Sequence, residues 1–151
     1  MARSEDRDAE LLTGAALTVF RLNGQFLSVA EELARIAGLT AARWQVLGAV
    51  AREPLPVSAI ARRFGSTRQS VQRIADLLVE RGLAEYRPNP AHSRAKLLAP
   101  TGAGLAALRR ISPDHGRVAK ALVAELGEED AERTLESLRR LSRALDRLGG
   151  D

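Results

Sequence analysis

The fold is decided by residues 57–82, which read VSAIARRFGSTRQSVQRIADLLVERG. Counted from Val57 as the first position, a small residue (Ala61) stands fifth, a glycine (Gly65) ninth, and apolar residues fourth, eighth, fifteenth and eighteenth. This spacing predicts two short helices, over residues 57–64 and 67–81, joined by a tight turn. The small residue lets the helices approach each other, and the glycine accepts the backbone conformation of the turn. We therefore predict a helix-turn-helix.

The second of these helices has a polar start and an apolar opposite face. Ser66 followed by Gln69 matches a capping box, which predicts that the helix begins at Ser66. If its first turns entered the major groove of double-stranded DNA, arginine could pair with guanine, glutamine with adenine, and hydroxyls with bases or phosphates. An ordinary surface helix would more typically carry Glu and Lys pairs, whereas the first acidic residue here is Asp76. The predicted DNA-binding residues of this helix are Ser66, Thr67, Arg68, Gln69, Ser70, Gln72 and Arg73.

After Gly82 the pattern changes from helix to strand. Residues 83–87 and 95–99 flank a turn-rich tip at 88–94, which predicts a β-hairpin, the wing of a winged helix. Arg94 stands where an extended cation could enter a narrow minor groove. Arg87 and Lys96, on the strands, are expected within reach of phosphates. The predicted DNA surface therefore spans residues 57–96.

Helical patterns flank this segment on both sides. Apolar residues recur at three- and four-residue spacing over 9–37, which predicts one long helix, or two in series, ending at Gly38. Thr40 is expected to cap a next helix that ends near the prolines of 53–56, and Pro56 to stand at the start of the helix after it. Beyond the hairpin, helix restarts at residues 100–102, is interrupted by Pro113 and resumes. A leucine stripe on the final segment needs a partner surface; its members are Leu135, Leu138, Leu141, Leu145 and Leu148.

The charges of the chain are segregated along the sequence. Residues 40–110 hold twelve basic and four acidic side chains, a net charge of +8, within a chain of net charge +4. Residues 1–39 and 111–151 each have a net charge of −2. A surface that neutralises phosphates has this pattern, whereas a solvated charged face would mix the signs.

Composition excludes several other classes of function. The chain has 151 residues, about one domain, and no cysteine, which excludes disulfides, thiol nucleophiles and thiol redox sensing. It has no glycine-rich phosphate loop and no metal-ligand spacing, so we expect no enzyme, no catalytic residue, no metal and no cofactor. No apolar run reaches about 18 residues and the N-terminus alternates charges, so we expect neither a signal peptide nor a membrane anchor, and a cytoplasmic protein.

Two single residues permit a second interpretation. His92 could act as a titrating group or as a metal ligand. The chain has only one other imidazole, His115, so a metal site would also need carboxylates. A position near a DNA phosphate fits a residue of the wing better. Whether His92 alters the wing geometry or makes binding depend on pH stays open. Trp44 is a weak candidate for lining an effector pocket, since a lone tryptophan is more often part of the core.

Taken together, these segments resemble the MarR (multiple-antibiotic-resistance regulator) family of bacterial transcription factors, over about residues 39–107. The strongest parts are 39–47 (LTAARWQVL), 60–63 (IARR), 67–73 (TRQSVQR) and 85–96 (EYRPNPAHSRAK). The resemblance implies an obligate homodimer on a palindromic operator, often released by a small aromatic or amphipathic effector. It implies a winged helix-turn-helix over 39–101 and a helical dimerisation region made of 1–38 and 102–151.

The chain departs from the family pattern at two positions. The wing of the family usually carries Asp two residues before its arginine, and here His92 stands at that place, so the usual acidic support for Arg94 is missing. Ser66 stands where an apolar residue is usual before the recognition helix.

The predicted fold class is therefore mainly α with a small β-hairpin. The predicted function is a sequence-specific, dimeric repressor released by a small molecule. The alternatives are an architectural DNA-binding protein of low specificity and a regulator without a ligand; a winged-helix adaptor for proteins alone does not require the central +8. A regulator would keep a large preference for one palindrome as salt rises, whereas an architectural protein binds almost only through phosphates.

Overall fold

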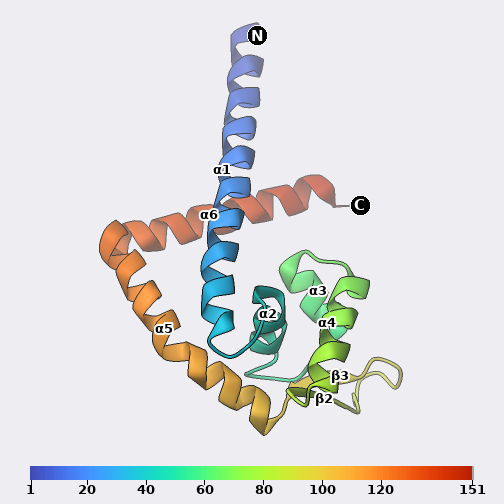
Figure 1. Ribbon diagram of the computed structural model, residues 1–151. Helices are drawn as coiled ribbons and strands as arrows, with labels where there is room; N and C mark the ends of the chain where they lie inside the picture. The colour runs from blue at the N-terminus through green and yellow to red at the C-terminus, as the bar shows by residue number, and fades with distance from the viewer. Residues whose placement is uncertain (151) are drawn as a thin grey trace. The chain divides into compact units, whose positions relative to one another are not determined.

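The computed structural model describes residues 1–150, and of Ala2 only the backbone. The chain forms two compact units, Met1–Ile111 and Ser112–Asp151. The fold is mainly helical with a small antiparallel sheet, which confirms the predicted fold class (Figure 1).

The chain begins with one continuous helix, α1 (Ala2–Arg35), where the sequence left one or two helices open. Gly38 ends this region in the left-handed conformation, with φ +69°. The helix α2 (Ala41–Ala49) then starts at Thr40, whose Oγ1 accepts a hydrogen bond from the backbone N–H of Arg43 at 3.2 Å. The predicted cap at Thr40 is thus confirmed, and α2 ends before the prolines that were expected to stop it.

The helix-turn-helix consists of α3 (Val57–Phe64) and α4 (Arg68–Glu80) and matches the predicted spans within about one residue. Gly65 lies between them with φ +61°, a left-handed conformation that glycine adopts without strain. The predicted capping box at Ser66 is wrong. Ser66 belongs to the turn, where its N–H donates to the oxygen of Ala61 at 2.9 Å, and Thr67 is the cap, accepting from the N–H of Ser70 at 3.1 Å.

The wing consists of β2 (Ala84–Arg87) and β3 (Leu97–Pro100), which pair antiparallel with Tyr86 opposite Leu98. A third strand, β1 (Leu55–Pro56), pairs with the other edge of β3, so the order is β1-β3-β2. The sequence did not indicate β1, because two residues are too few to show alternation and proline donates no ladder hydrogen bond. Figure 1 shows the hairpin beside the last turns of α4.

One hydrophobic core holds the helix-turn-helix and the sheet together. Side chains from successive elements meet in it with at most 1% of their surface exposed: Leu47 of α2, Ile60 of α3, Leu78 of α4, Leu98 of β3 and Ile111 of α5 (Gly102–Leu126). Because these residues come from five elements, the position of α4 relative to the wing is fixed by close packing.

The prediction that Pro113 interrupts a helix is wrong. The helix α5 runs through Pro113 without a break. Proline lacks the N–H that would bond to the carbonyl four residues earlier, but one missing bond inside a 25-residue helix does not end it here. The boundary between the two compact units nevertheless falls close to this point, after Ile111.

The second unit contains the end of α5 and the helix α6 (Glu128–Gly149), joined at Gly127. The predicted leucine stripe lies on α6, where four of its members are exposed, from 38% at Leu138 to 85% at Leu148, and Leu141 is partly buried. Large apolar side chains are also exposed on α1, among them Leu12 at 65% and Phe20 at 71%. Within residues 1–150, no helix is both long enough and apolar enough to cross a bilayer.

Candidate nucleic-acid interface

The helix α4 separates a polar face from a buried face. Val71, Ala75 and Leu78 face the core with at most 2% exposure. The seven polar residues predicted to bind DNA at the start of this helix are all exposed. The hydroxyl oxygen of Thr67 already accepts a hydrogen bond from the Ser70 N–H, as the cap of the helix. The local sequence pattern therefore places these side chains on one accessible surface.

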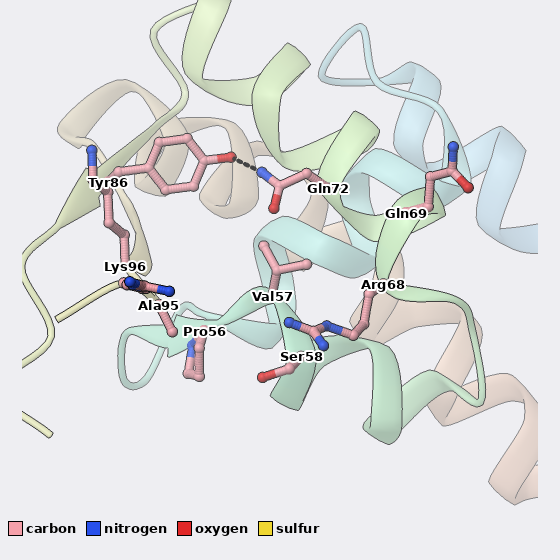
Figure 2. A pocket seen from close by; sticks show the side chains of 10 residues that line it. Pro56, Val57, Ser58, Arg68, Gln69, Gln72, Tyr86, Ala95 and Lys96 are labelled. Carbon is pink, nitrogen blue, oxygen red and sulfur yellow. Dashed lines mark hydrogen bonds between the residues drawn. The ribbon is translucent and has the colours of Figure 1, made fainter. Parts of the chain in front are cut away.

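A cavity of about 510 Å³ lies between α4 and the wing (Figure 2). Arg68, Gln69 and Gln72 of α4 line it together with Arg94 and Lys96 of the wing. Its ten described lining residues include three cations and no acidic side chain. Such a concave basic surface attracts anions, phosphates included. The other lining residues are Pro56, Val57, Ser58, Tyr86 and Ala95.

The remaining predicted residues lie outside this cavity. Ser66, Thr67, Ser70 and Arg73 do not line it, and neither does Arg87. The guanidinium of Arg87 is paired with the Glu85 carboxylate, at 2.8 Å from Nη2 and 2.9 Å from Nε to Oε1. Because about half of each side chain is exposed, the pair is worth at most about 1 kcal/mol, and a phosphate could replace the carboxylate.

Gln72, Asp76 and Tyr86 form a hydrogen-bonded triad that connects α4 with β2. The Gln72 amide nitrogen donates to Asp76 Oδ1 at 2.9 Å and to the Tyr86 hydroxyl at 2.8 Å. The Tyr86 hydroxyl donates to the same Asp76 oxygen at 2.5 Å. The hydrogen bonds from Tyr86 and from Gln72 lower the pKa of Asp76, since they favour its ionised form.

Sequence analysis missed Asp76 and Tyr86 as members of the site. One signal was available, because Gln72 and Asp76 stand four residues apart and therefore share a helix face. Tyr86 gave no comparable signal, since its position beside α4 depends on the pairing of the hairpin.

Tyr86 is expected to ionise only far above its ordinary pKa of 10.0. Burial raises the pKa of Tyr86 most, and the hydrogen bond and negative charge of Asp76 raise it further. The native state therefore binds this proton more tightly than the unfolded state, so its contribution to stability is complete below pH 10 and is lost as pH rises further. Because the chain has a single tyrosine, the ultraviolet absorbance of phenolate reports on Tyr86 alone.

The matched control is Asp76→Asn, which removes the charge and keeps the shape. Its tyrosine should titrate at a lower pH than in the parent, yet above that of the denatured chain, because burial remains. Equal titration curves for the native and denatured parent would contradict the described environment of Tyr86.

His92 supports the tip of the wing. Its Nδ1 accepts hydrogen bonds from the backbone N–H of Arg94 at 3.3 Å and of Ala95 at 3.1 Å. The aspartate that is usual at this position in the family could accept the same two hydrogen bonds. The His92 imidazole therefore replaces the aspartate as hydrogen-bond acceptor at the wing tip. Nδ1 accepts only while it carries no proton, which assigns the hydrogen of the neutral ring to Nε2.

Trp44 packs half-buried against the hydrophobic core. Among residues 1–150, no group of three or more His, Cys, Asp and Glu side chains could hold a metal ion.

Comparisons with known proteins give the family. A family model described as the MarR family matches residues 37–95. An uncharacterized protein of Mycobacterium tuberculosis is 41% identical over 127 residues, which cover 84% of this chain and 89% of that protein.

Two solved structures share the fold. The transcriptional regulator MosR of M. tuberculosis, determined in complex with DNA, has a TM-score of 0.75 and 24% identity, over 89% of this chain and 98% of MosR. Staphylococcus aureus MarR, determined in complex with salicylate and kanamycin, has a TM-score of 0.71 and 17% identity, over 91% of both chains. The sequence match and the shared winged helix agree with each other. The chain belongs to the MarR family of DNA-binding transcription regulators.

Proposed function

We propose that this protein is a dimeric repressor that binds a palindromic operator with α4 and the wing of each subunit. The observation that carries the proposal is the basic cavity, where Arg68 of α4 meets Arg94 and Lys96 of the wing. The DNA complex of MosR supports the same use of the shared fold. The protein acts by binding, without catalysis or a cofactor.

Each predicted residue has a role in this proposal. The first turns of α4 enter the major groove, where Arg68, Gln69, Gln72 and Arg73 contact bases. The hydroxyls of Ser66, Thr67 and Ser70 contact bases or phosphates. Arg94 enters the minor groove, and Arg87 and Lys96 bind phosphates.

The exposed apolar faces support a homodimer. Residues 1–38 and 102–151 are proposed to form the dimerisation region, and 39–101 the DNA-binding region. Leu12 and Phe20 of α1 and Leu145 and Leu148 of α6 are each at least half exposed in the single chain. Exposed apolar helix faces of this kind are usually covered by a partner in soluble proteins, and a second copy offers the same faces.

Release by a small molecule is the proposed regulation. S. aureus MarR, which shares the fold, has been crystallised with salicylate and kanamycin, and this supports an effector for the present chain. An effector that binds the DNA-free state better than the DNA-bound state would shift the protein off its operator.

Selection of bound sequences from random DNA tests the function. We expect one enriched palindrome, and a preference for it over unrelated DNA that persists as salt is raised. Footprinting upstream of the protein's own gene then locates an operator. If no palindrome is enriched and binding depends on phosphates alone, the protein is an architectural DNA-binding protein instead.

Replacing Arg94 with alanine is expected to weaken operator binding by roughly tenfold. The slope of log affinity against log salt concentration should also become less steep, by the equivalent of about one phosphate contact per subunit. The reason is the loss of one minor-groove cation from each wing. Fluorescence-polarisation titrations over a series of salt concentrations measure both quantities.

Arg109→Ala is the control for Arg94→Ala, since it removes an equal charge from an exposed position on α5. Its affinity and salt dependence should match those of the parent. Parent-like operator binding by Arg94→Ala would rule out the minor-groove role.

A further inference from the structure

We infer that Asp76 and Tyr86 set the base specificity of Gln72, because they occupy its amide hydrogens and leave only its oxygen to contact a base. This inference rests on the proposed function, since it requires α4 in the major groove. The Gln72 nitrogen carries two hydrogens and donates to two acceptors, Asp76 Oδ1 at 2.9 Å and the Tyr86 hydroxyl at 2.8 Å. No amide hydrogen remains for DNA.

The chemistry of the partners determines which way the amide points. The Asp76 carboxylate only accepts hydrogen bonds, and its lowered pKa keeps it ionised at neutral pH. The Tyr86 hydroxyl gives its own hydrogen to Asp76, so its oxygen is an acceptor toward Gln72. A reversed amide would bring its oxygen against the carboxylate with no hydrogen between them.

The oxygen of Gln72 is left for the ligand. In Figure 2 the amide nitrogen points to Tyr86, and the oxygen points the other way, toward the side of the cavity where Val57 lies. Gln72 lines this cavity with Arg68 of the same helix. The residue therefore presents a fixed acceptor in front of a basic surface.

A fixed acceptor distinguishes bases differently from a free glutamine. In the major groove, only adenine N6 and cytosine N4 offer hydrogen-bond donors, whereas guanine and thymine offer acceptors. A free glutamine selects adenine because it accepts from N6 and also donates to N7. With both hydrogens occupied, Gln72 selects adenine and cytosine, which offer an amino donor in the major groove, over guanine and thymine. It does not distinguish adenine from cytosine.

The test measures base preference on the selected operator. Duplexes carrying each of the four bases at every recognition position, changed symmetrically in both half-sites, are titrated by fluorescence polarisation. For the parent we expect one position per half-site where adenine and cytosine bind equally well and guanine and thymine about tenfold more weakly. Gln72→Ala should abolish this preference at that position.

Releasing the amide should create a new preference. In Asp76→Ala the nitrogen can donate to adenine N7, so adenine should exceed cytosine by about tenfold at the same position. Tyr86→Phe removes the other acceptor and should act in the same direction. A variant that merely loses structure would bind all duplexes more weakly, and it would not gain a preference for adenine over cytosine at one position.

Gln69→Ala is the matched control, because Gln69 lies on the same face of α4 and takes no part in the triad. It should leave the preference at the Gln72 position intact. The inference is overturned if the parent prefers adenine alone there, or if folded Asp76→Ala and Tyr86→Phe both keep the parental pattern. The proposed function would survive either result, whereas the absence of any enriched palindrome overturns both.

Discussion

Replacing Gly104 with alanine is expected to lower the free energy of unfolding of the Met1–Ile111 unit by about 3 kcal/mol. A Cβ at this position in α5 would overlap the backbone oxygen of Leu83 and lie 3.2 Å from Leu47 Cδ1. The Leu83 backbone cannot easily move away, because its oxygen accepts from Thr101 N–H at 3.1 Å and its N–H donates to Leu78 at 2.9 Å. Urea denaturation followed by far-ultraviolet circular dichroism measures the loss.

Gly48→Ala is the matched control in the same compact unit. Gly48 lies in α2, and a Cβ there meets nothing within 4 Å. Alanine should stabilise α2 by about 0.5–1 kcal/mol, since glycine loses more backbone entropy in a helix. A Gly104→Ala protein as stable as the parent would show that α5 does not pack against Leu83 as described.

Replacing Leu138 with aspartate is expected to convert the protein to a monomer and to weaken operator binding by about a hundredfold. Leu138 belongs to the exposed leucine stripe of α6, and a carboxylate in an apolar dimer contact would be buried without a partner. A monomer holds one half-site only and loses the effective concentration that the second subunit provides. Analytical ultracentrifugation gives the mass, and fluorescence polarisation gives the affinity.

Ser137→Asp supplies the control, because it adds the same carboxylate one residue earlier on α6. Successive helical residues point about 100° apart, so Ser137 lies at the edge of the stripe. This variant should stay dimeric and bind its operator like the parent. A dimeric Leu138→Asp protein with parental affinity would refute the role of this face in dimerisation.

Local sequence patterns predicted the helix-turn-helix closely. The spacing around Ala61 and Gly65 predicted both helices, and Thr40 was identified as a cap, because these features depend on hydrogen bonds between residues at most four positions apart. The same local reasoning failed where two caps competed. Ser66 and Thr67 are both good capping residues, and the turn uses the N–H of Ser66, which leaves Thr67 as the cap.

Apart from the hairpin, the contacts that join distant residues were not predicted. The strand β1 exists only because β3 offers its free edge, and Tyr86 joins Gln72 and Asp76 only because the hairpin folds back beside α4. Position 104 requires glycine because the backbone oxygen of Leu83, 21 positions earlier in the chain, leaves no room for a Cβ. No periodicity or motif encodes such contacts, because they depend on the packing of several elements at once.

The sequence by itself determined the helix-turn-helix, the basic central segment and the polar face of α4, since each follows from local hydrogen bonding, helical periodicity or charge. Only the tertiary structure decided what those polar side chains can do. Arg68 of α4 and Arg94 and Lys96 of the wing line one cavity, and the Gln72 amide nitrogen donates to Asp76 and Tyr86, because the shared core fixes two elements that are separate in the sequence.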